Sequence, residues 1–161
     1  MIVVEDRLSE IFEFLPPING FNPVFRYGDD KELNTFLSSY DGKSSTPYPL
    51  IWLVYPYTEK QSRRHVEITN MKFILAVRNN EVMLYDERII KTFKGLLIPL
   101  YNNIIESFKK ANTMLTDDEY NVVKYPNYGS GEEAKANDIW DAITITTDVE
   151  FNDFRLLNIK Y

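Results

Sequence analysis

The chain has 161 residues, and its 24 acidic and 18 basic side chains leave a formal net charge of −6. This length predicts one domain with a single core, and the acidic balance argues against a protein that coats nucleic acid with a basic face. There is no cysteine and one histidine, which excludes disulfides, a thiol nucleophile, a thiolate zinc site and a multi-histidine metal cage.

The N-terminal stretch predicts a protein without a secretion signal. Its apolar run covers only residues 1–4 and is followed at once by Glu5 and Asp6, whereas a signal peptide needs a basic start and a longer apolar core. We therefore expect a cytoplasmic start. No apolar stretch approaches the roughly 18–20 residues that span a bilayer, so no membrane partner is expected.

The first quarter of the chain predicts two helices separated by a short strand. Apolar side chains recur at helical spacing over residues 2–15, and Pro16 ends that helix. Residues 24–27 follow as a strand. A second helix is predicted over residues 31–40, capped by one of the two aspartates that precede it.

Three longer segments have the composition of strands. Residues 48–55 are apolar on both faces, which is typical of a central strand. Residues 65–78 alternate, but the apolar parity changes partway, which predicts a β-bulge near Thr69 and Asn70. Residues 138–151 alternate again and carry apolar side chains on one face.

A long helix is predicted between the second and third of these strands, over residues 98–111. Pro99 would interrupt a helix that began at Thr92, so we place it in the first turn, where its missing N–H costs nothing. Residues 112–137 are polar and rich in turn formers. They predict a loop that becomes ordered only against a neighbouring subunit, with strand character limited to residues 120–125.

These elements together predict an α+β fold. We expect a single domain over residues 1–152, with a mostly antiparallel, twisted β-sheet and helices packed on one face. Residues 153–161 form a separate extended C-terminal segment with apolar residues on both sides. That segment is either a strand of the same sheet or an assembly arm that pairs with a neighbouring subunit.

The polar clusters match no catalytic or metal-binding motif. His65 follows two arginines, which permits a phosphate or acid–base site but is more typical of a solvated loop entering a strand. The acidic run 117–119 lacks the calcium-loop register, and the glycines of 129–131 lack the Lys-Ser/Thr of a phosphate loop. Asp148 and Glu150 share a strand face and serve most simply to keep it soluble. We expect no enzyme activity, no cofactor and no specifically bound metal.

Aromatic residues make up 14 % of the chain and include 11 tyrosines. Tyrosine and tryptophan are enriched at protein interfaces because each combines a large apolar body with a polar tip. The candidate interface residues lie at element ends, in loops and in the C-terminal segment: Tyr48, Tyr55, Tyr57, Tyr125, Tyr128, Phe154, Leu156 and Tyr161. The alternative is that most of these rings close the edges of the core.

The order of elements resembles a family of virus proteins. The resemblance rests on the segments 46–54 (TPYPLIWLV), 93–101 (FKGLLIPLY) and 138–143 (DIWDAI), together with an N-terminal helix closed by two prolines. The chain is similar over roughly residues 2–152 to the tail-terminator or tail-completion proteins of tailed bacteriophages, especially small virion proteins of phages that infect Bacteroidetes.

The resemblance implies a structural virion protein of the phage neck or tail, made in the host cytoplasm. It implies a closed ring, hexameric or dodecameric, that contacts portal, connector or tail proteins and lets genomic DNA pass through its lumen without sequence-specific binding. It implies no catalytic residues. The alternative function is a monomeric protein-binding adaptor or an immunity-type module of a bacterium or prophage. A small hydrolase would require a deep pocket lined by convergent polar groups.

Overall fold

The structure is a computed structural model that describes residues 1–39, 48–79, 84–128 and 139–153. Along the chain its elements are α1 (Val4–Phe12), β1 (Val24–Gly28), α2 (Asp30–Ser39), β2 (Leu50–Val54), β3 (Glu59–Gln61), β4 (His65–Asn79), α3 (Tyr85–Arg88), the π-helical segment η1 (Ile89–Leu97), α4 (Ile98–Lys110), β5 (Met114–Thr116), β6 (Asn121–Tyr128) and β7 (Ile139–Asn152). None of the helices in these ranges is both long enough and apolar enough to cross a membrane.

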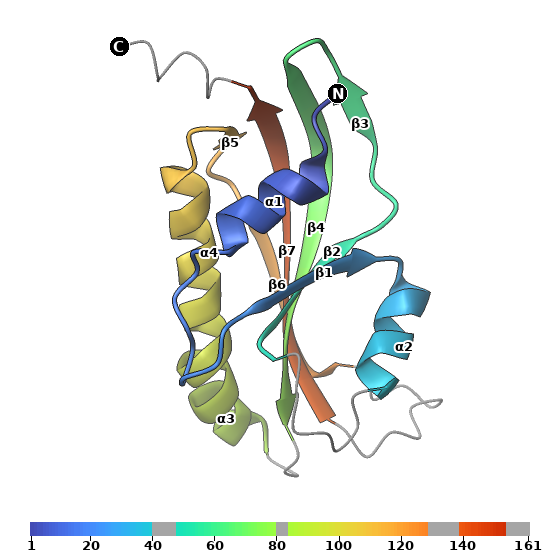
Figure 1. Ribbon diagram of the computed structural model, residues 1–161. Helices are drawn as coiled ribbons and strands as arrows, with labels where there is room; N and C mark the ends of the chain where they lie inside the picture. The colour runs from blue at the N-terminus through green and yellow to red at the C-terminus, as the bar shows by residue number, and fades with distance from the viewer. Residues whose placement is uncertain (40–47, 80–83, 129–138, 154–161) are drawn as a thin grey trace.

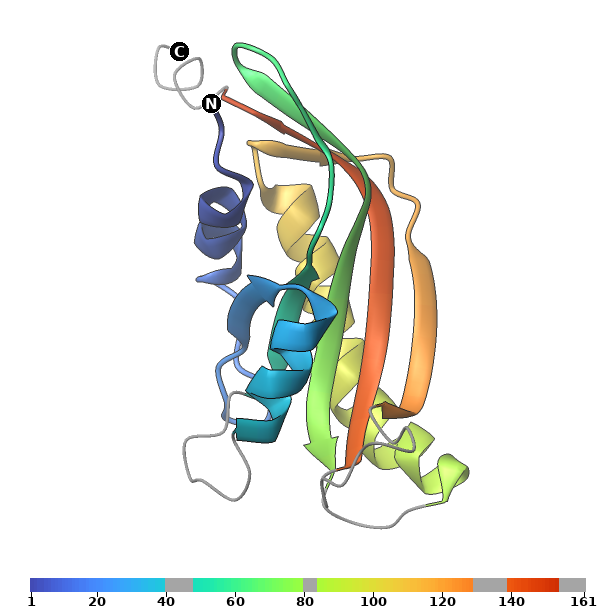
Figure 2. The ribbon, with the colours of Figure 1, turned by 90° about the vertical axis from the view of Figure 1, so that its right-hand side faces the viewer.

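The described strands form one sheet built around two long central strands, β4 and β7. The order is β1-β2-β4-β7-β5, with β3 beside β4 and β6 beside β7. Every pairing is antiparallel except that of β1 with β2, which is parallel. The expected α+β class and the mostly antiparallel sheet are therefore confirmed. Figures 1 and 2 show how β4 and β7 run the length of the molecule.

One face of the sheet carries the larger core. Side chains of α1, η1 and α4 pack there against alternate residues of the strands, including Ile51, Phe73 and Ile145. In Figure 1, α1 crosses over the sheet, and the long helix that ends in α4 runs beside it. The aromatic centre of this core joins Phe12 of α1 to Phe73 and Phe108, with ring centroids 6.1 and 5.8 Å away.

The other face is covered by α2, which corrects the expectation that the helices lie on one face. Leu33 and Leu37 of α2 pack with Trp52 and Ile74 in a second, smaller core. The physical reason is the parallel pairing of β1 with β2, because a chain that joins parallel neighbours must cross over a face of the sheet. The helix itself begins as predicted, since Asp29 Oδ1 accepts a hydrogen bond from the Glu32 N–H at 2.7 Å.

The predicted β-bulge is confirmed. The register between β4 and β7 shifts between Ile68 and Met71, and Asn70 has a left-handed φ of 55°. Asparagine tolerates that conformation better than most residues. The Asn70 N–H donates to Asp148 Oδ1 at 2.8 Å, so the donor displaced by the bulge is satisfied. Because of this bulge, Val66 and Ile68, which precede it, face the same larger core as Phe73, which follows it.

The long helix starts earlier than the sequence suggested. It runs without interruption through α3, η1 and α4, so Pro99 lies within a helical run instead of at its beginning. In a regular α-helix, a proline here would crowd the carbonyl of Gly95 and leave it without a donor. The wider π-helical turn relieves this conflict, because hydrogen bonds there reach one residue further back, as from the Ile98 N–H to Phe93 O.

Part of the segment predicted to be a loop is β-structure. Residues 114–116 form β5, and β6 extends to residue 128, three residues beyond the predicted strand. Both strands pair with β7, which supplies the hydrogen bonds that their polar composition did not suggest. Residues 129–137, the remainder of that predicted loop, lie outside the described residues.

Candidate functional site

The one histidine lies beside two glutamates, at the end of the sheet where β3 pairs with β4 and β5 pairs with β7. His65 and Glu67 belong to β4 and Glu150 to β7, and all three share the sheet face opposite the larger core. The register puts Glu67 directly across from Glu150 and His65 directly across from Asn152. Alternation along a strand explains the grouping, because residues two apart project to the same side.

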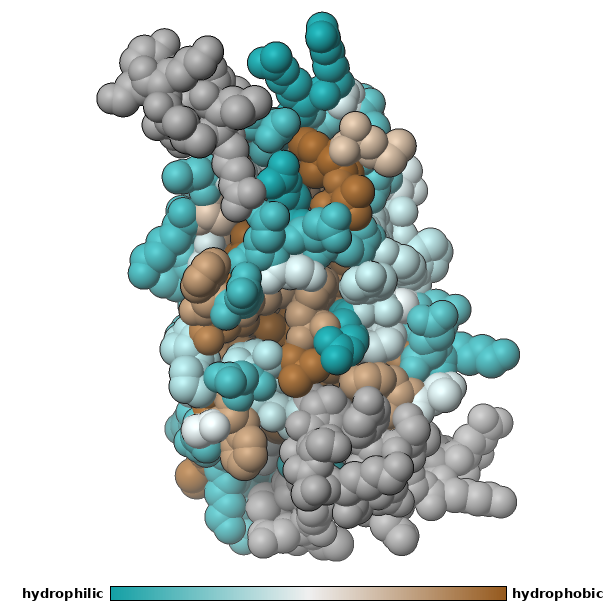
Figure 3. Space-filling view, in the orientation of Figure 1, coloured by the Kyte–Doolittle hydropathy of each residue, from teal (hydrophilic) through white to brown (hydrophobic). Residues whose placement is uncertain are grey.

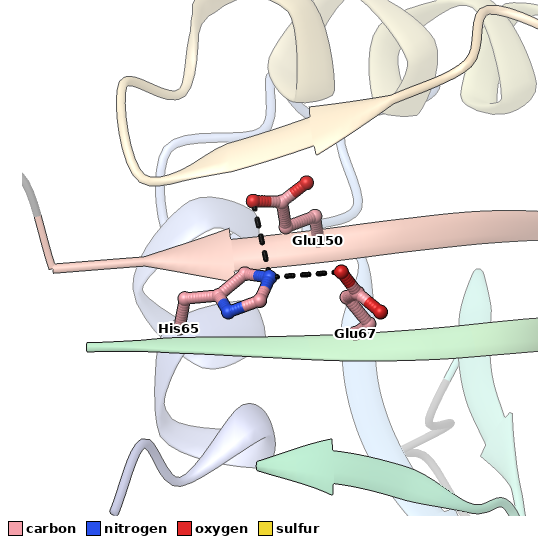
Figure 4. A group of neighbouring side chains, drawn as sticks. All are labelled: His65, Glu67 and Glu150. Carbon is pink, nitrogen blue, oxygen red and sulfur yellow. Dashed lines mark hydrogen bonds and ion pairs between the residues drawn. The ribbon is translucent and has the colours of Figure 1, made fainter. Parts of the chain in front are cut away.

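Both carboxylates meet the same ring nitrogen. His65 Nε2 lies 3.1 Å from Glu67 Oε1 and 3.3 Å from Glu150 Oε1, and Figure 4 shows the two glutamates converging on it. The other ring nitrogen, Nδ1, lies 2.6 Å from Ser62 Oγ. The imidazole is therefore held from both sides, with one nitrogen turned to a hydroxyl and the other to two acidic groups.

The cluster is open to solvent and close to further acidic groups. The side chains of His65, Glu67 and Glu150 are 32, 47 and 42 % exposed. An adjoining hollow of about 470 Å³ is lined by both glutamates and also by Asp117 and Asp148. Small solutes can thus reach the cluster, and cations are favoured around it.

A second cluster joins α1 to the segment after β2. Glu5 accepts hydrogen bonds from the hydroxyls of Tyr55 and Tyr57, whose rings contact each other edge to face at 5.0 Å. Burial acts to raise the pKa of Glu5, but the two hydroxyl donors outweigh it and the pKa is lowered. Burial and the hydrogen bond to Glu5 raise the pKa of both tyrosines.

We expect Glu5→Gln to reduce the acid sensitivity of folding. The pKa of Glu5 is lower in the folded chain than its ordinary value of 4.5, so the carboxylate contributes stability above that value, and this contribution disappears as the pH falls through the folded pKa. Urea unfolding measured from neutral pH down to about pH 3 should show that wild type loses more stability than Glu5→Gln. Asp6→Asn changes an exposed carboxyl of the same helix, and its free energy of unfolding should fall with pH as steeply as that of wild type. If the free energies of unfolding of wild type and Glu5→Gln fell equally with pH, the attribution of this acid sensitivity to Glu5 would be contradicted.

Three of the predicted interface tyrosines find their contacts within the chain. Tyr48 is buried and packs on Trp140 at 4.5 Å, while Tyr55 and Tyr57 are held by Glu5. Tyr55 and Tyr57 also pack, partly buried, against the edge of the larger core. Of the other predicted interface residues, Tyr125 and Tyr128 belong to β6.

The C-terminal part of the predicted interface is not described by the structure. Phe154, Leu156 and Tyr161 lie outside the described residues, and so does the predicted assembly arm that contains them. The last described residue, Asp153, is tied to the domain, since its N–H donates to Arg64 O at 3.1 Å and its carboxylate pairs with Arg7 at 3.3 Å.

The edge strand β6 exposes three apolar side chains. Val122, Val123 and Tyr125 are 39, 47 and 40 % exposed. Among the described strands, β6 pairs only with β7, so its other side forms an edge of the sheet. At the opposite edge lies β1, which pairs only with β2 within the same ranges. One edge of the sheet therefore consists of β6 and β5, and the other of β1 and β3.

The outer surface over α1 and α4 is mixed in character. Figure 3 shows brown apolar areas that are separated by hydrophilic side chains. Phe14 and Phe21 are among the exposed apolar residues of the chain, at 84 and 59 %. A shallow hollow of about 510 Å³ between α1 and the end of α4 is lined by polar and apolar groups without a convergent catalytic set. This face offers no better candidate for a site than the histidine cluster.

No protein-family model matches this chain, and no curated protein matches it either. The sites therefore have to be judged on geometry. Sequence reasoning linked His65 to its neighbouring arginines, whereas the structure brings Glu67 and Glu150 to its Nε2. The alternation of residues 65 and 67 along one strand was the available signal, but the partner on β7 could not be deduced without the register.

Proposed function

We propose that this chain is a ring-forming structural subunit of the neck or tail of a tailed bacteriophage. The resemblance of its sequence to tail-terminator and tail-completion proteins suggests the class. The proposed ring contacts portal, connector or tail proteins, and DNA passes through its lumen. The net charge of −6 suits that role, because a passage for DNA should not hold phosphates.

The observation that carries the proposal is the pair of unlike sheet edges. A ring needs head-to-tail contacts, in which one surface of a subunit meets a different surface of the next. Here β6 and β5 form one edge of the sheet, and β1 and β3 form the other. An exposed apolar edge strand is a template for main-chain pairing with another chain. Contact between β6 of one copy and β1 of the next would continue the sheet around a ring.

The oligomeric state tests this proposal. Sedimentation velocity over a rising protein concentration should reveal one defined oligomer, and negative-stain images should show closed rings. A chain that stays monomeric up to its solubility limit would overturn the ring and favour the adaptor function. Symmetric dimers would contradict the head-to-tail arrangement, because they use the same surface on both copies.

We expect Val123→Lys to abolish the ring while leaving the monomer folded. Val123 is 47 % exposed on the edge strand, so the substitution costs little stability, whereas a charge at a strand edge opposes pairing between chains. The matched control is Ile90→Lys, which places the same charge at a 64 % exposed apolar position on η1. Light scattering should find monomers for Val123→Lys and wild-type rings for the control. Rings in both variants would remove β6 from the interface.

A further inference from the structure

We propose that His65, Glu67 and Glu150 bind a divalent transition-metal ion of the zinc class. The ligands are His65 Nε2 and one carboxylate oxygen from each glutamate, and these three groups lie within 4.8 Å of one another. The mixed nitrogen and oxygen donor set is one that Zn²⁺ accepts. This metal site does not depend on ring formation. From the sequence, no specifically bound metal was expected.

The spacing of the donors fits a tetrahedral ion. Ligands held about 2.0–2.2 Å from zinc in tetrahedral geometry stand about 3.3–3.6 Å from one another. His65 Nε2 lies 3.1 Å from Glu67 Oε1 and 3.3 Å from Glu150 Oε1. Small side-chain rotations therefore suffice to open a space for the ion between the three groups.

Ser62 is placed to support the histidine tautomer that a metal ion needs. The Ser62 hydroxyl lies 2.6 Å from His65 Nδ1 and 3.1 Å from the His65 carbonyl oxygen. When the hydroxyl donates its one proton to the carbonyl, it accepts at Nδ1, which then carries the ring proton and leaves the lone pair on Nε2, beside the two carboxylates. A hydrogen bond from the second ring nitrogen to an oxygen is the usual support of a histidine ligand.

The charges of the two glutamates favour a cation between them. Glu67 and Glu150 are directly opposite on neighbouring antiparallel strands, a placement that is unfavourable for like charges. Lys60 Nζ stands 3.8 Å from Glu67, but the lysine side chain is 85 % exposed and offsets little of this repulsion. A dication neutralises the two carboxylates completely, since −2 and +2 sum to zero.

The site leaves room for an exchangeable ligand. Three protein donors occupy three tetrahedral positions and leave the fourth for a water molecule. Asn152, across from His65 in the register, is buried, and its Oδ1 has no hydrogen-bond partner among the described residues. A metal-bound water would supply a donor for such an oxygen. The arrangement thus corresponds to an open, solvent-accessible metal site.

Isothermal titration calorimetry with zinc chloride tests the proposal on chelator-dialysed, tag-free protein. We expect one Zn²⁺ per chain for wild type, and a weakening of about 100-fold or more for His65→Ala and for Glu150→Gln. Ser62→Ala, which removes only the positioning hydrogen bond, should weaken binding by about 10- to 100-fold. The control is Asp117→Asn, because Asp117 lines the adjoining acidic hollow but is no ligand, and this variant should bind like wild type.

The absorption spectrum of bound cobalt is a second measurement, and it distinguishes coordination by His65 from general attraction of cations to the acidic surface. Tetrahedral Co²⁺ bound at this site should show visible bands that disappear in His65→Ala, while circular dichroism shows that the variant stays folded. The proposal is overturned if His65→Ala binds zinc as wild type does. It is overturned equally if Asp117→Asn weakens binding as much as His65→Ala, since zinc would then be held by the acidic hollow in general. Absence of stoichiometric zinc binding in wild type also overturns it.

Discussion

Arg88→Ala is expected to lower the free energy of unfolding by about 3–5 kcal/mol. Arg88, in α3, donates from Nη1 to Asp141 Oδ1 of β7 at 2.7 Å, and the two side chains are 1 and 0 % exposed. Removal of the arginine takes this cation away from a buried carboxylate, and breaking a buried ion pair by removing one partner costs far more than the net worth of the pair. Urea unfolding followed by circular dichroism measures the loss.

A double variant separates the two contributions. In Arg88→Met with Asp141→Leu, both charges are replaced by apolar side chains, and such replacements are often neutral or stabilising. We therefore expect the double variant to recover most of the stability that Arg88→Ala loses. The ion pair holds the first turn of the long helix against the sheet, so the double variant should fold to the same structure. A loss below about 1 kcal/mol in Arg88→Ala would show that the charges are not buried in solution.

Phe73→Ala is expected to cost a similar amount, about 3–5 kcal/mol. Phe73 lies in the middle of β4, is fully buried, and its ring stands 6.1 Å from that of Phe12 and 5.9 Å from that of Phe108. Truncation loses the transfer free energy of the ring and leaves a cavity at the point where α1 and α4 meet the sheet. The urea concentration at the midpoint of unfolding should fall, while the m value, which is the dependence of the free energy of unfolding on urea concentration, stays constant.

The matched control for this variant is Phe14→Ala. The same atoms are deleted there, but Phe14 is 84 % exposed, so the change in stability should stay within about 0.5 kcal/mol. Equal losses in the two variants would mean that the effect of Phe73→Ala does not come from the core. A large change in the m value of Phe73→Ala would indicate that the packing of α1 had been lost before global unfolding.

Local sequence features were sufficient for several elements of this fold. The apolar spacing of residues 2–15 predicted α1, although the helix is shorter than the pattern. A capping aspartate predicted the start of α2, and the parity change in β4 predicted the bulge at Asn70. These features involve residues within a few positions of one another, so the physical rules that govern them can be read from the chain without knowledge of its neighbours.

The elements that the sequence missed depend on distant partners. Strand β5 and the last three residues of β6 lie in a segment of polar, turn-rich composition, and pairing with β7 makes them strands. The parallel contact of β1 with β2 brings α2 to the face opposite α4, and no local pattern contains that information. The early part of the long helix contains Arg88, which pairs with Asp141 in the core. An arginine is not recognised as a core residue from sequence, so this part of the helix was not expected to pack against the sheet.

The same division applies to the candidate sites. Sequence alone determined an α+β domain without cysteine, with a single histidine and with Glu150 beside Asp148 on one face of a strand. Only the register of β4 against β7 decided that His65, Glu67 and Glu150 meet, and only the sheet order decided that β6 lies at one edge and β1 at the other. The reason is that side-chain period is a local property of a strand, whereas the choice of partner is a global balance of burial and hydrogen bonding over the whole sheet.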